Sequence, residues 1–503
     1  MSLNDINIVR GPNGLGRPLP GEDFISGLVF YGATLPSGFS SSARIKQFFS
    51  ILDAEAAGIV ADYSDATAST STYLVTNKGA DTDTFNLKFT DPLGAVIDLG
   101  TYTVVGTPAS VSATATAIAA VINAGTATHG FTASVGTATV TITAPKKYGI
   151  YPNSGTPYVK TETGTIAGTL TQNVVAGVAS IFAPYHYHIA EYFRLQPQGN
   201  LYVGIFATAY TFAEIATMQT FAQGTIRQFG VFVNGHAGAT SDMTTIQAVL
   251  AGMVTNHQPS QVLYAPNIQA VSDLTTLTDL TTFTNDRVSW VIGQDGGNLG
   301  NFLFLTTGKS VTCLGATLGS VSLSKVSENI GWVQKFNQAA LELNTIAFAN
   351  GTLYSAVTSG LLSAINSKGY IFLLKHIGTS GSYYNDSWTA TAVTSDYCTI
   401  ENNRTADKAS RGIRTILLPQ LSGPLQVNAD GTLTADVIAN YKALCNVVLQ
   451  AMLAAGEISA SKVTINPVQN VLATSTLNIS VQIVPVGVAR QITVTIGFTV
   501  SVA

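Results

Sequence analysis

The sequence predicts an α/β protein in which a largely parallel sheet is interrupted by a β-rich insertion and followed by a C-terminal α+β domain. Between about residues 181 and 400, apolar strand-like runs alternate with helical patterns, which is the order that produces parallel sheets. Residues 65–180 shift to Thr, Ala, Gly and Val in short alternating runs. From residue 401 onward, one long helical pattern precedes two β segments.

The chain begins with two short parts. Residues 1–20 form a predicted N-terminal arm, because Gly and Pro at positions 11–18 oppose a helix. Residues 21–64 are the first part of the α/β core. A buried strand is expected over 27–32, and a helix is expected over 43–57, where four apolar residues recur at helical spacings: Ile45, Phe48, Phe49 and Leu52.

Residues 65–180 are predicted to form a β-sandwich-like surface domain. Residues 85–89 and 138–143 alternate between apolar and polar side chains, and only 112–124 has a helical pattern. Because the α/β pattern resumes at about residue 181, this domain is an insertion, and inserted modules normally lie on the surface. In the resumed core, strands are expected at 201–206, 228–233, 261–265 and 288–292, and helices at 213–223 and 243–255.

Residues 401–503 are predicted to form an α+β domain that ends in a C-terminal arm at 477–503. A helix begins at Thr434 or Ala435 and runs to about Ala455, and Gly456 is placed to end it in the left-handed conformation. The stripe expected to face a core is Val437, Ile438, Tyr441, Leu444, Val448 and Met452.

Two β segments close the chain, at 477–484 and 491–502, and they are joined at residues 485–487. The second segment alternates Ile, Val and Phe with Thr, Gly and Ser up to its end. Such alternation predicts a half-buried strand.

Charge is scarce throughout the chain. The 503 residues include 24 Lys and Arg and 28 Asp and Glu, so 10% are charged, where about 25% is usual. With a net charge of −4 and no cluster of cations, nucleic acid is not an expected partner. We interpret the polar, weakly charged surface as a first indication of self-assembly, with compositional drift as the alternative.

The sequence also bears on location. No run of about 18 apolar residues predicts a membrane span, and no basic segment precedes an apolar run at the start, so no signal peptide is expected. Cys313, Cys398 and Cys445 are odd in number and far apart, which fits a reducing cytosol.

No motif predicts catalysis, and no cofactor is expected. The glycine-rich segments 11–16 and 293–300 do not open a helix after a strand with dinucleotide spacing, and we interpret them as turns. A Ser/His/Asp triad could be assembled from scattered residues, but nothing marks one. An enzyme hypothesis therefore depends on the α/β core alone, and a fold does not imply a function.

A few His and Asp residues were considered as metal ligands. His186 and His188 would share one face of a strand, so a metal pair and an aromatic packing edge both stay open, although no third ligand is nearby. Asp81 and Asp83 lack the rest of a calcium loop. Asp430 precedes a glycine and is expected to form a turn.

Both chain ends carry apolar strand-forming residues beside flexible connectors. They are Ile6, Ile8 and Val9 at the start, and Ile492, Val494, Ile496, Phe498 and Val500 at the end. An uncharged edge strand invites pairing with a neighbour. In one interpretation these are inter-subunit arms, and each chain lends strands to the next. In the other, both strands complete the sheet of their own chain, and the residues alone leave both interpretations open.

Several segments resemble the sheath proteins of contractile tails in phages and related injection machines, in particular a sheath group common in phages, prophages and tail-like particles. They are NDINIV at 4–9, SKVSENIGWV at 324–333, NRTADKASRGIR at 403–414, LLP at 417–419, GEIS at 456–459, NPVQNVL at 466–472 and VPVGVARQI at 484–492. The resemblance covers the first 60 residues and about 185–503. The inserted domain does not share it.

The resemblance implies a sheath-type α/β core and a C-terminal domain completed by terminal arms of neighbouring subunits. Six copies would form a ring, and rings would stack around an inner tail tube protein and contract to drive the tube into a target cell envelope. Baseplate and terminator proteins are the other implied partners. Such a subunit would assemble in the bacterial cytoplasm, become part of a tail or tail-like particle, and need no active site, metal or cofactor. The alternative is an α/β hydrolase-like enzyme or a carbohydrate-binding phage structural protein that uses the inserted domain.

Overall fold

The computed structural model describes residues 23–498. These residues divide into two compact units. The first unit holds the described residues up to Leu323 together with Ile330–Ser395, and the second holds Ser324–Asn329 together with the residues from Asp396 onward. Each unit has its own buried apolar cluster.

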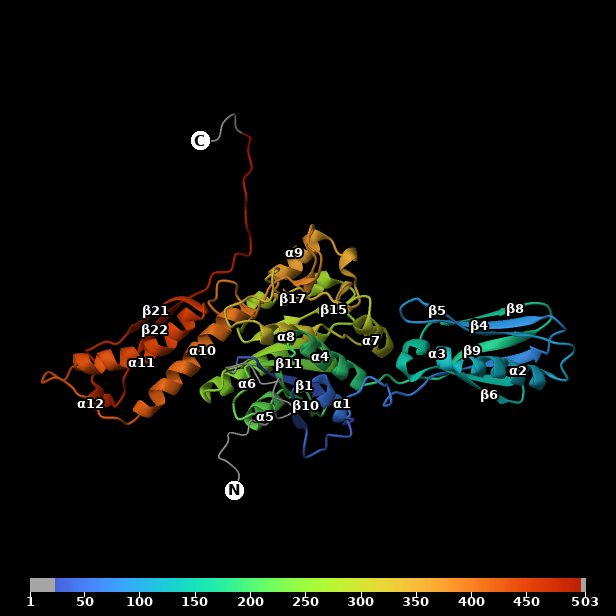
Figure 1. The fold of residues 1–503 in the computed structure, drawn as a ribbon, viewed down its shortest axis with the longest axis horizontal. Helices are drawn as coiled ribbons and strands as arrows, with labels where there is room; N and C mark the ends of the chain where they lie inside the picture. Colours follow the sequence, from blue (N-terminus) through green and yellow to red (C-terminus); the bar gives the residue numbers. More distant parts are fainter. Residues whose placement is uncertain (1–22, 499–503) are drawn as a thin grey trace, which may run out of the picture. The chain divides into compact units, whose positions relative to one another are not determined.

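A seven-stranded sheet lies at the centre of the first unit, in the order β17-β14-β12-β11-β1-β10-β2 (Figure 1). Its strands are β1 (Ile25–Tyr31), β2 (Ile45–Phe48), β10 (Asn200–Phe206), β11 (Gln228–Ala237), β12 (Gln261–Asn267), β14 (Val288–Val291) and β17 (Tyr370–Ile371). Neighbouring strands are parallel, except that β2 runs antiparallel to β10. The prediction of a largely parallel sheet within a mixed α/β fold is confirmed.

Helices cover both faces of this sheet (Figure 1). On one face lie α4 (Phe182–Leu195) and α8 (Leu314–Leu323), where the rings of Phe30 and Tyr185 stack with centroids 4.1 Å apart. On the other face, α5 (Glu214–Phe221) and α6 (Thr240–Thr255) pack against Val29 and Tyr31. Successive strand residues point to opposite faces, so β1 contributes to both layers and is buried along its whole length.

The prediction of a helix over 43–57 is wrong for the first half of that range. Residues Ile45–Phe48 form strand β2, which pairs with the outer edge of β10, and only Ile51–Ala56 form helix α1. Ser50 separates the two elements, because its Oγ accepts a hydrogen bond from the Asp53 amide at 3.3 Å while Asp53 accepts one from the Ser50 amide at 3.0 Å. This reciprocal cap starts the helix later than the apolar spacing suggested.

The stretch expected to be an insertion contains two antiparallel sheets, β6-β7-β3-β9 and β5-β4-β8. Its elements are β3 (Thr70–Asn77), β4 (Thr84–Thr90), β5 (Val96–Thr103), α2 (Val111–Ala124), α3 (Thr126–His129), β6 (Thr132–Gly136), β7 (Thr139–Thr143), 3-10 turns at Lys146–Tyr148 and Tyr151–Asn153, β8 (Tyr158–Glu162) and β9 (Ala167–Val175). The inward side chains of both sheets and of α2 share one buried cluster. The outward side chains of β7, Thr139, Thr141 and Thr143, are hydroxyl-bearing, as alternation predicts.

Short elements complete the first unit. They are 3-10 turns at Leu274–Thr276, Leu280–Thr282 and Tyr354–Ala356, strands β13 (Thr284–Asn285), β15 (Gly293–Asp295), β16 (Ile346–Phe348), β18 (Leu373–Leu374), β19 (Tyr383–Tyr384) and β20 (Ala390–Thr391), and helices α7 (Leu299–Thr307) and α9 (Ser359–Ser367). The six strands pair two by two.

The second unit consists of two long helices and a two-stranded antiparallel sheet. Its elements are α10 (Ile400–Leu417), a 3-10 turn (Leu418–Gln420), α11 (Ala435–Ala454), β21 (Ile458–Thr464), α12 (Val471–Thr474) and β22 (Ser480–Pro485). Gly456 follows Ala455, the C-cap of α11, and has a φ of +71°, so it ends the helix in the left-handed conformation, as predicted.

The buried line of α11 differs from the predicted stripe. Cys445, Leu449 and Met452 are the buried residues, and only Met452 belongs to the predicted stripe, whose other members are half-buried. The reason is that α11 packs against α10 on one side and lies against β21 on another, which shifts the buried line.

Among the described residues, α11 is also the one helix that is long and apolar enough to cross a membrane, by length and composition only. This is weak evidence for a span, because a helix that packs inside a folded domain passes the same test.

Candidate functional site

Segments from distant parts of the sequence meet around the first turns of α10 in the second unit. The Arg404 guanidinium donates to Ser324 Oγ at 2.6 Å and to the Ser324 carbonyl at 3.2 Å. The Lys325 ammonium donates to the Ala455 carbonyl at 3.2 Å. Ser327 Oγ donates to the Gly456 carbonyl at 3.3 Å. Segment 324–329 is thereby bound both to α10 and to the end of α11.

Two ion pairs extend this network. The Lys408 ammonium lies 2.5 Å from Glu457 Oε1, and the Arg490 guanidinium lies 3.2 Å from Glu401 Oε1. Asn329 Nδ2 donates to the same Glu401 oxygen at 3.1 Å. Glu401 and Glu457 are buried, and a buried carboxylate is tolerated only when charged groups and hydrogen-bond donors compensate it. We call the set Asn329, Glu401, Arg404, Lys408, Glu457 and Arg490 the arm-root network.

The sequence segments that resemble sheath proteins supply most of this network, at 324–329, 403–414, 456–459 and 484–492. The sequence reasoning did not identify Glu401 or assign a role to Arg490. One signal was available: five charged residues occur within eleven positions of a chain in which 10% are charged, namely Glu401, Arg404, Asp407, Lys408 and Arg411. They recur every three or four residues, which places them along one side of a helix.

The first part of the predicted C-terminal arm, 477–503, pairs within its own unit and is not free there. β21 and β22 pair from Ile458 opposite Pro485 to Thr464 opposite Ser480, and Ser459 Oγ donates to the Pro485 carbonyl at 2.9 Å. Beyond Pro485 the described chain belongs to no helix or strand. Figure 1 shows it leading away from β22 toward the C-terminus.

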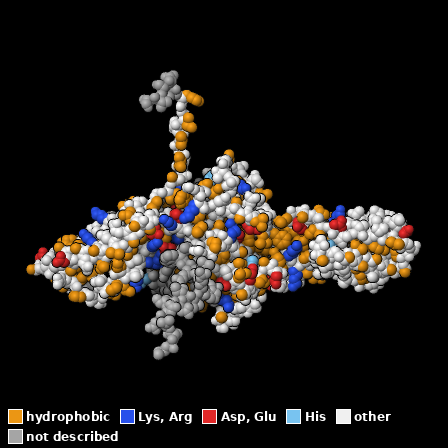
Figure 2. Space-filling view, in the orientation of Figure 1, with side chains coloured by type: hydrophobic (Ala, Val, Ile, Leu, Met, Phe, Trp, Pro, Cys, Tyr) orange, Lys and Arg blue, Asp and Glu red, His pale blue; other side chains and the backbone are white. Residues whose placement is uncertain are grey.

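Large apolar side chains are exposed along the arm (Figure 2). Ile492, Val494 and Ile496 are 72–88% exposed, and Phe498 is fully exposed. The expected half-buried strand is therefore absent over 491–498, because the chain has left the β21–β22 sheet and pairs with no other strand of its own described residues. Ile6, Ile8, Val9 and Val500 lie outside the described residues.

His186 and His188 lie on helix α4, so the expected strand placement is wrong. The apolar run around them follows helical rather than two-residue spacing, and residues two apart on a helix point about 200° apart. His186 Nε2 lies 2.9 Å from Glu55 Oε1. His188 is buried against Phe232, with ring centroids 4.5 Å apart, and burial lowers its pKa to about 3. Within residues 23–498, no group of three or more His, Cys, Asp or Glu side chains is arranged to hold a metal ion.

Segment 293–300 contains strand β15, a turn and the start of helix α7, so it does open a helix after a strand, although without the glycine spacing of a dinucleotide site. Two carboxylates, Asp295 in this segment and Glu342 outside it, already accept hydrogen bonds from amides at the start of α7. Asp295 Oδ2 accepts hydrogen bonds from the amides of Asn298 at 2.7 Å and Asn301 at 3.1 Å. Glu342 accepts weaker ones from the amides of Leu299 and Gly300, both at 3.4 Å. The chain's own acids therefore occupy the place where such a loop would hold a phosphate.

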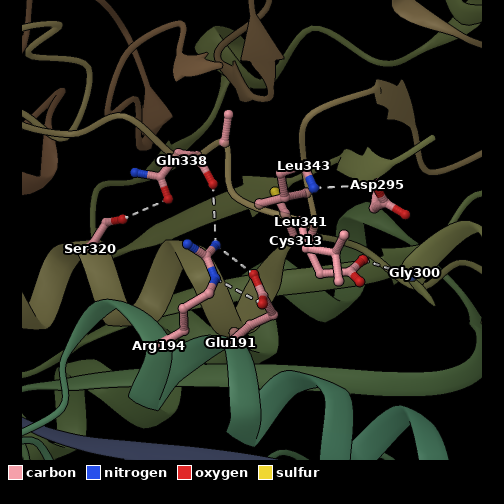
Figure 3. Close-up of polar contacts among 12 residues, drawn as sticks. Glu191, Arg194, Asp295, Gly300, Cys313, Ser320, Gln338, Leu341 and Leu343 are labelled. Atoms are coloured by element: carbon pink, nitrogen blue, oxygen red, sulfur yellow. Dashed lines mark hydrogen bonds and ion pairs between the residues drawn. The ribbon is translucent and has the colours of Figure 1, made fainter. Parts of the chain in front are cut away.

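These acids belong to a polar cluster that also contains Glu191, Arg194 and Gln338 (Figure 3). Arg194 binds both Glu191 oxygens, at 2.9 and 2.6 Å, and the Gln338 carbonyl at 3.2 Å. Burial, and then the charge of Asp295, raise the pKa of Glu342 to about 7.

Cys313 lies beside this cluster (Figure 3). Burial raises the pKa of its thiol to about 12. The thiol thus stays protonated at neutral pH and is a poor nucleophile.

The carboxyl ends of the parallel strands are the usual ligand site of such sheets, at the point beside β1 where the strand order reverses. In this chain several of its own side chains contact one another there. The Tyr264 hydroxyl donates to Asp242 Oδ2 at 2.6 Å, and His236 Nε2 lies 3.0 Å from the same oxygen. Tyr210 stacks on His236 with ring centroids 4.4 Å apart, and the Tyr31 hydroxyl donates to Glu214 at 3.2 Å.

The remaining Asp residues considered in the sequence stabilise turns. Asp83 Oδ2 accepts hydrogen bonds from the amides of Ala80 and Ile166 and from the amide and hydroxyl of Thr165, and these bonds lower its pKa. Asp81 accepts one from the amide of Gly106. Asp430 accepts two from Thr432, and Gly431 between them has a φ of +81°, so the predicted turn is present.

Two family models match the sequence. One described as "DUF2586, N-terminal domain" matches residues 74–388, and one described as "DUF2586, C-terminal domain" matches residues 396–503. The second match begins at the residue where the main part of the second unit begins. The first includes most of the stretch expected to be an insertion. No curated protein matches the sequence.

Solved structures with similarity to the chain include sheath proteins. The contracted helical sheath of the anti-feeding prophage matches with 14% identity over 65% of this chain and 84% of that chain, with a TM-score of 0.43. The contracted PVC sheath complex of an extracellular contractile injection system matches with 14% identity over 63% and 81%, with a TM-score of 0.41. A sheath tail protein from Listeria innocua matches with 10% identity over 93% and 96%, with a TM-score of 0.38.

Proposed function

The chain belongs to the DUF2586 family, and from this premise we propose that it is a structural subunit of a contractile tail sheath. The observation that carries the proposal is the described part of the arm, 491–498, which presents large apolar side chains to solvent. Burying such a side chain contributes about 1.5–3 kcal/mol. A neighbouring copy that covers the arm would therefore gain several of these contributions.

The β21–β22 sheet supports a mutual exchange of arms. Within the described residues it has two strands only, so each strand has one edge without a partner in that sheet. A two-stranded sheet is marginally stable on its own, and added strands stabilise it. Pairing through an edge supplies backbone hydrogen bonds, while alternate side chains select the partner. The arm of one subunit and the open sheet of another have the chemistry for this pairing.

The finer features of the proposal follow from the resemblance in the sequence. Residues 1–20, with Ile6, Ile8 and Val9, would act as a second inter-subunit arm. Six subunits would form each ring, and stacked rings would surround an inner tail tube and meet baseplate and terminator proteins at their ends. The assembled particle would contract by a collective rearrangement of rigid subunits and drive the tube into a target cell envelope.

We propose a structural rather than a catalytic role for the core. Beside β1, where such sheets usually bind a ligand, aromatic rings and carboxylates of the chain contact one another. Cys313, elsewhere in the core, is a buried thiol. No observation favours the hydrolase-like or carbohydrate-binding alternative.

The proposal is tested with the purified full chain and a variant lacking residues 492–503. Wild-type protein should form rings or tubes by negative-stain electron microscopy and large particles by light scattering. The truncated variant should stay folded and fail to polymerise. Wild-type protein that remains monomeric would refute the sheath role, and tubes of normal morphology from the truncated variant would refute the arm assignment.

Side-chain substitutions separate the two faces of the arm. Ile492→Ser combined with Ile496→Ser removes two large apolar groups and should impair polymerisation. The matched control, Thr493→Ser with Thr495→Ser, changes the alternate positions and should leave it intact. Equal loss in both variants would show that the alternation of the arm has no role.

A further inference from the structure

We propose that Arg490 anchors the C-terminal arm to α10, so that the free arm begins at Gln491 rather than at the Pro485-Val486-Gly487 connector. The inference rests on the proposed function, because it concerns the arm that the function uses. Beyond the proposed function, the inference specifies the position at which the arm bends and the residue that holds the chain just before that position.

The anchor is an ion pair between one buried and one partly exposed side chain. The Arg490 guanidinium lies 3.2 Å from Glu401 Oε1, and their side chains are 38% and 2% exposed. Glu401 stands in the first turn of α10, an 18-residue helix. Its carboxylate is therefore fixed to a rigid element, while Arg490 reaches it from the chain beyond β22.

The burial pattern along the arm changes at this residue. Val486 and Val488, before Arg490, are half-buried, whereas all residues from 491 to 498 are exposed. The chain thus stays against its own unit for several residues after β22 ends at Pro485. The connector contains Pro and Gly, but a second attachment at Arg490 restricts movement there.

The chemistry of Glu401 explains why this attachment resists displacement. Moving Arg490 away would remove a cation from a carboxylate whose side chain is 2% exposed, and weakening the compensation of a buried charge is unfavourable. Residues beyond Arg490 have no such constraint among the contacts described here. Bending therefore concentrates at Gln491 and beyond.

Glu401 also binds a second segment through the same oxygen. Asn329 Nδ2 donates to Glu401 Oε1 at 3.1 Å, and Asn329 is the last residue of Ser324–Asn329, the short stretch of the second unit that precedes Ile330 of the first. Glu401 Oε1 is therefore shared by the arm and by segment 324–329 of the same unit. The geometry assigns Arg490 the role of a positioning residue, and Glu401 that of the acceptor shared by the arm and this segment.

The test measures mobility along the arm of the unassembled full-length chain. A spin label is attached through a keto amino acid placed at Val488 or at Val494, which leaves the native cysteines unchanged. In the wild type, the label at 488 should be restricted and the label at 494 mobile. Arg490→Gln should make the label at 488 as mobile as that at 494, and Arg490→Lys should largely restore the restriction because it keeps the positive charge.

Lys462→Gln is the matched control, because Lys462 is an exposed side chain of β21 and the substitution removes one positive charge without touching Glu401. It should leave both labels unchanged. Glu401→Gln, checked for folding by circular dichroism, should release the label at 488 as Arg490→Gln does. Equal mobility at 488 in wild type and Arg490→Gln, or equal release by Lys462→Gln, would overturn the anchor.

The outcome for the anchor is separable from that for the sheath role. Label mobility is measured on single chains, so it does not depend on polymerisation. If wild-type chains polymerise, Arg490→Gln should slow tube formation without abolishing it, in contrast to loss of residues 492–503. If they do not, the sheath role fails while the mobility result still decides the position at which the arm bends.

Discussion

Ser180 Oγ donates a hydrogen bond to Asp65 Oδ1 at 2.6 Å, although 115 positions separate the two residues. The other oxygen of Asp65 accepts hydrogen bonds from the amides of Ile181 and Phe182, at the start of α4. Just inside this pair, the amide and carbonyl of Thr67 pair with those of Val178 at 3.0 Å in each direction. The stretch between them therefore begins and ends at one place on the first unit.

The first prediction is that residues 68–177 can be removed and replaced by a short Gly-Ser linker. The ends are already adjacent, and the two sheets and α2 bury their apolar side chains in a cluster of their own, so few contacts with the core are lost. Among these are the hydrogen bond from the Ile150 amide to the Thr306 carbonyl and the contact of Tyr148 with Phe302. The shortened chain should fold and polymerise, as judged by circular dichroism and negative-stain microscopy.

Asp65→Ala in the shortened chain is the control, because it removes the cap of α4 while keeping the deletion. It should lower the free energy of unfolding by about 1 kcal/mol. An insoluble shortened chain would show that the stretch is part of the core and would contradict the proposed boundaries at 65 and 180.

The strands of the central sheet could be predicted because their signal is local. β1, β10, β11 and β12 are apolar runs flanked by turns, and the parallel strands bury both faces. Strand β2 could not be predicted, because Ile45 and Phe48 are spaced as in a helix. They form a strand only because they pair with the open edge of β10. His186 and His188 were misplaced because the alternation of Tyr and His over 185–188 is what a strand would show, although these residues lie in helix α4.

The candidate site was only partly predictable. The apolar alternation of 492–498 is a property of neighbouring residues, so the sequence alone was enough to predict an apolar terminal segment there, whose role as an inter-subunit arm stays a prediction. The pairing of Arg490 with Glu401 joins residues 89 positions apart and depends on how β22 leads the chain past α10. No spacing rule connects two charges across that distance.

The second prediction concerns acid. Burial lowers the pKa of His188 to about 3 from an ordinary value of 6.5. The folded chain therefore keeps this ring neutral while the unfolded chain protonates it, and stability that is present above pH 6.5 is lost as the pH falls toward 3. Between pH 6.5 and 5 the loss should be about 2 kcal/mol. His188→Phe should reduce this loss, measured by urea denaturation with tryptophan fluorescence.

His257 provides the control for this measurement, since it is exposed after α6. His257→Gln should retain the acid sensitivity of the wild type. A His188→Phe variant that loses stability as steeply as the wild type would assign the effect to other groups.

The third prediction concerns the opposite pH direction. The pKa of Glu342 is raised to about 7 from 4.5, so the folded chain holds this proton more tightly than the unfolded chain. The resulting contribution to the free energy of unfolding is fully present below pH 4.5 and is lost as the pH rises through 7. The charges of Asp295 and Glu191 repel its ionised form, and Tyr187 lies close enough to interact with its charge. Because Glu342 is only half-buried, the loss between pH 5.5 and 8.5 should be about 1–2 kcal/mol.

Glu342→Gln keeps a neutral side chain at this position and should flatten the pH dependence above pH 6. Asp436→Asn, an exposed acid in the first turn of α11, is the control and should not change the slope. The quantity compared is the difference in unfolding free energy between variant and wild type at each pH. A difference that stays constant from pH 5.5 to 8.5 would mean that Glu342 titrates alike in the folded and unfolded chains.

The last prediction addresses the ion pair between Lys408 and Glu457, which links α10 to the residue after Gly456. The Glu457 side chain is buried, so Lys408→Met leaves a carboxylate without its cation. The cost should be about 3 kcal/mol, the low end of the range for breaking a buried pair. Because the effect is local to the second unit, amide hydrogen exchange of α10 and α11 should accelerate while that of the central sheet stays unchanged.

Lys442→Met on α11 is the matched control, because Lys442 is half-buried on a neighbouring helix and has no partner among the contacts described here. It should leave exchange at α10 nearly unchanged. The double variant Lys408→Met with Glu457→Met removes both charges and should recover much of the loss, since an apolar pair avoids the desolvation of the ions. A double variant as unstable as Lys408→Met alone would show that the stem of Lys408, rather than the charge on Glu457, determines the stability of this part of the unit.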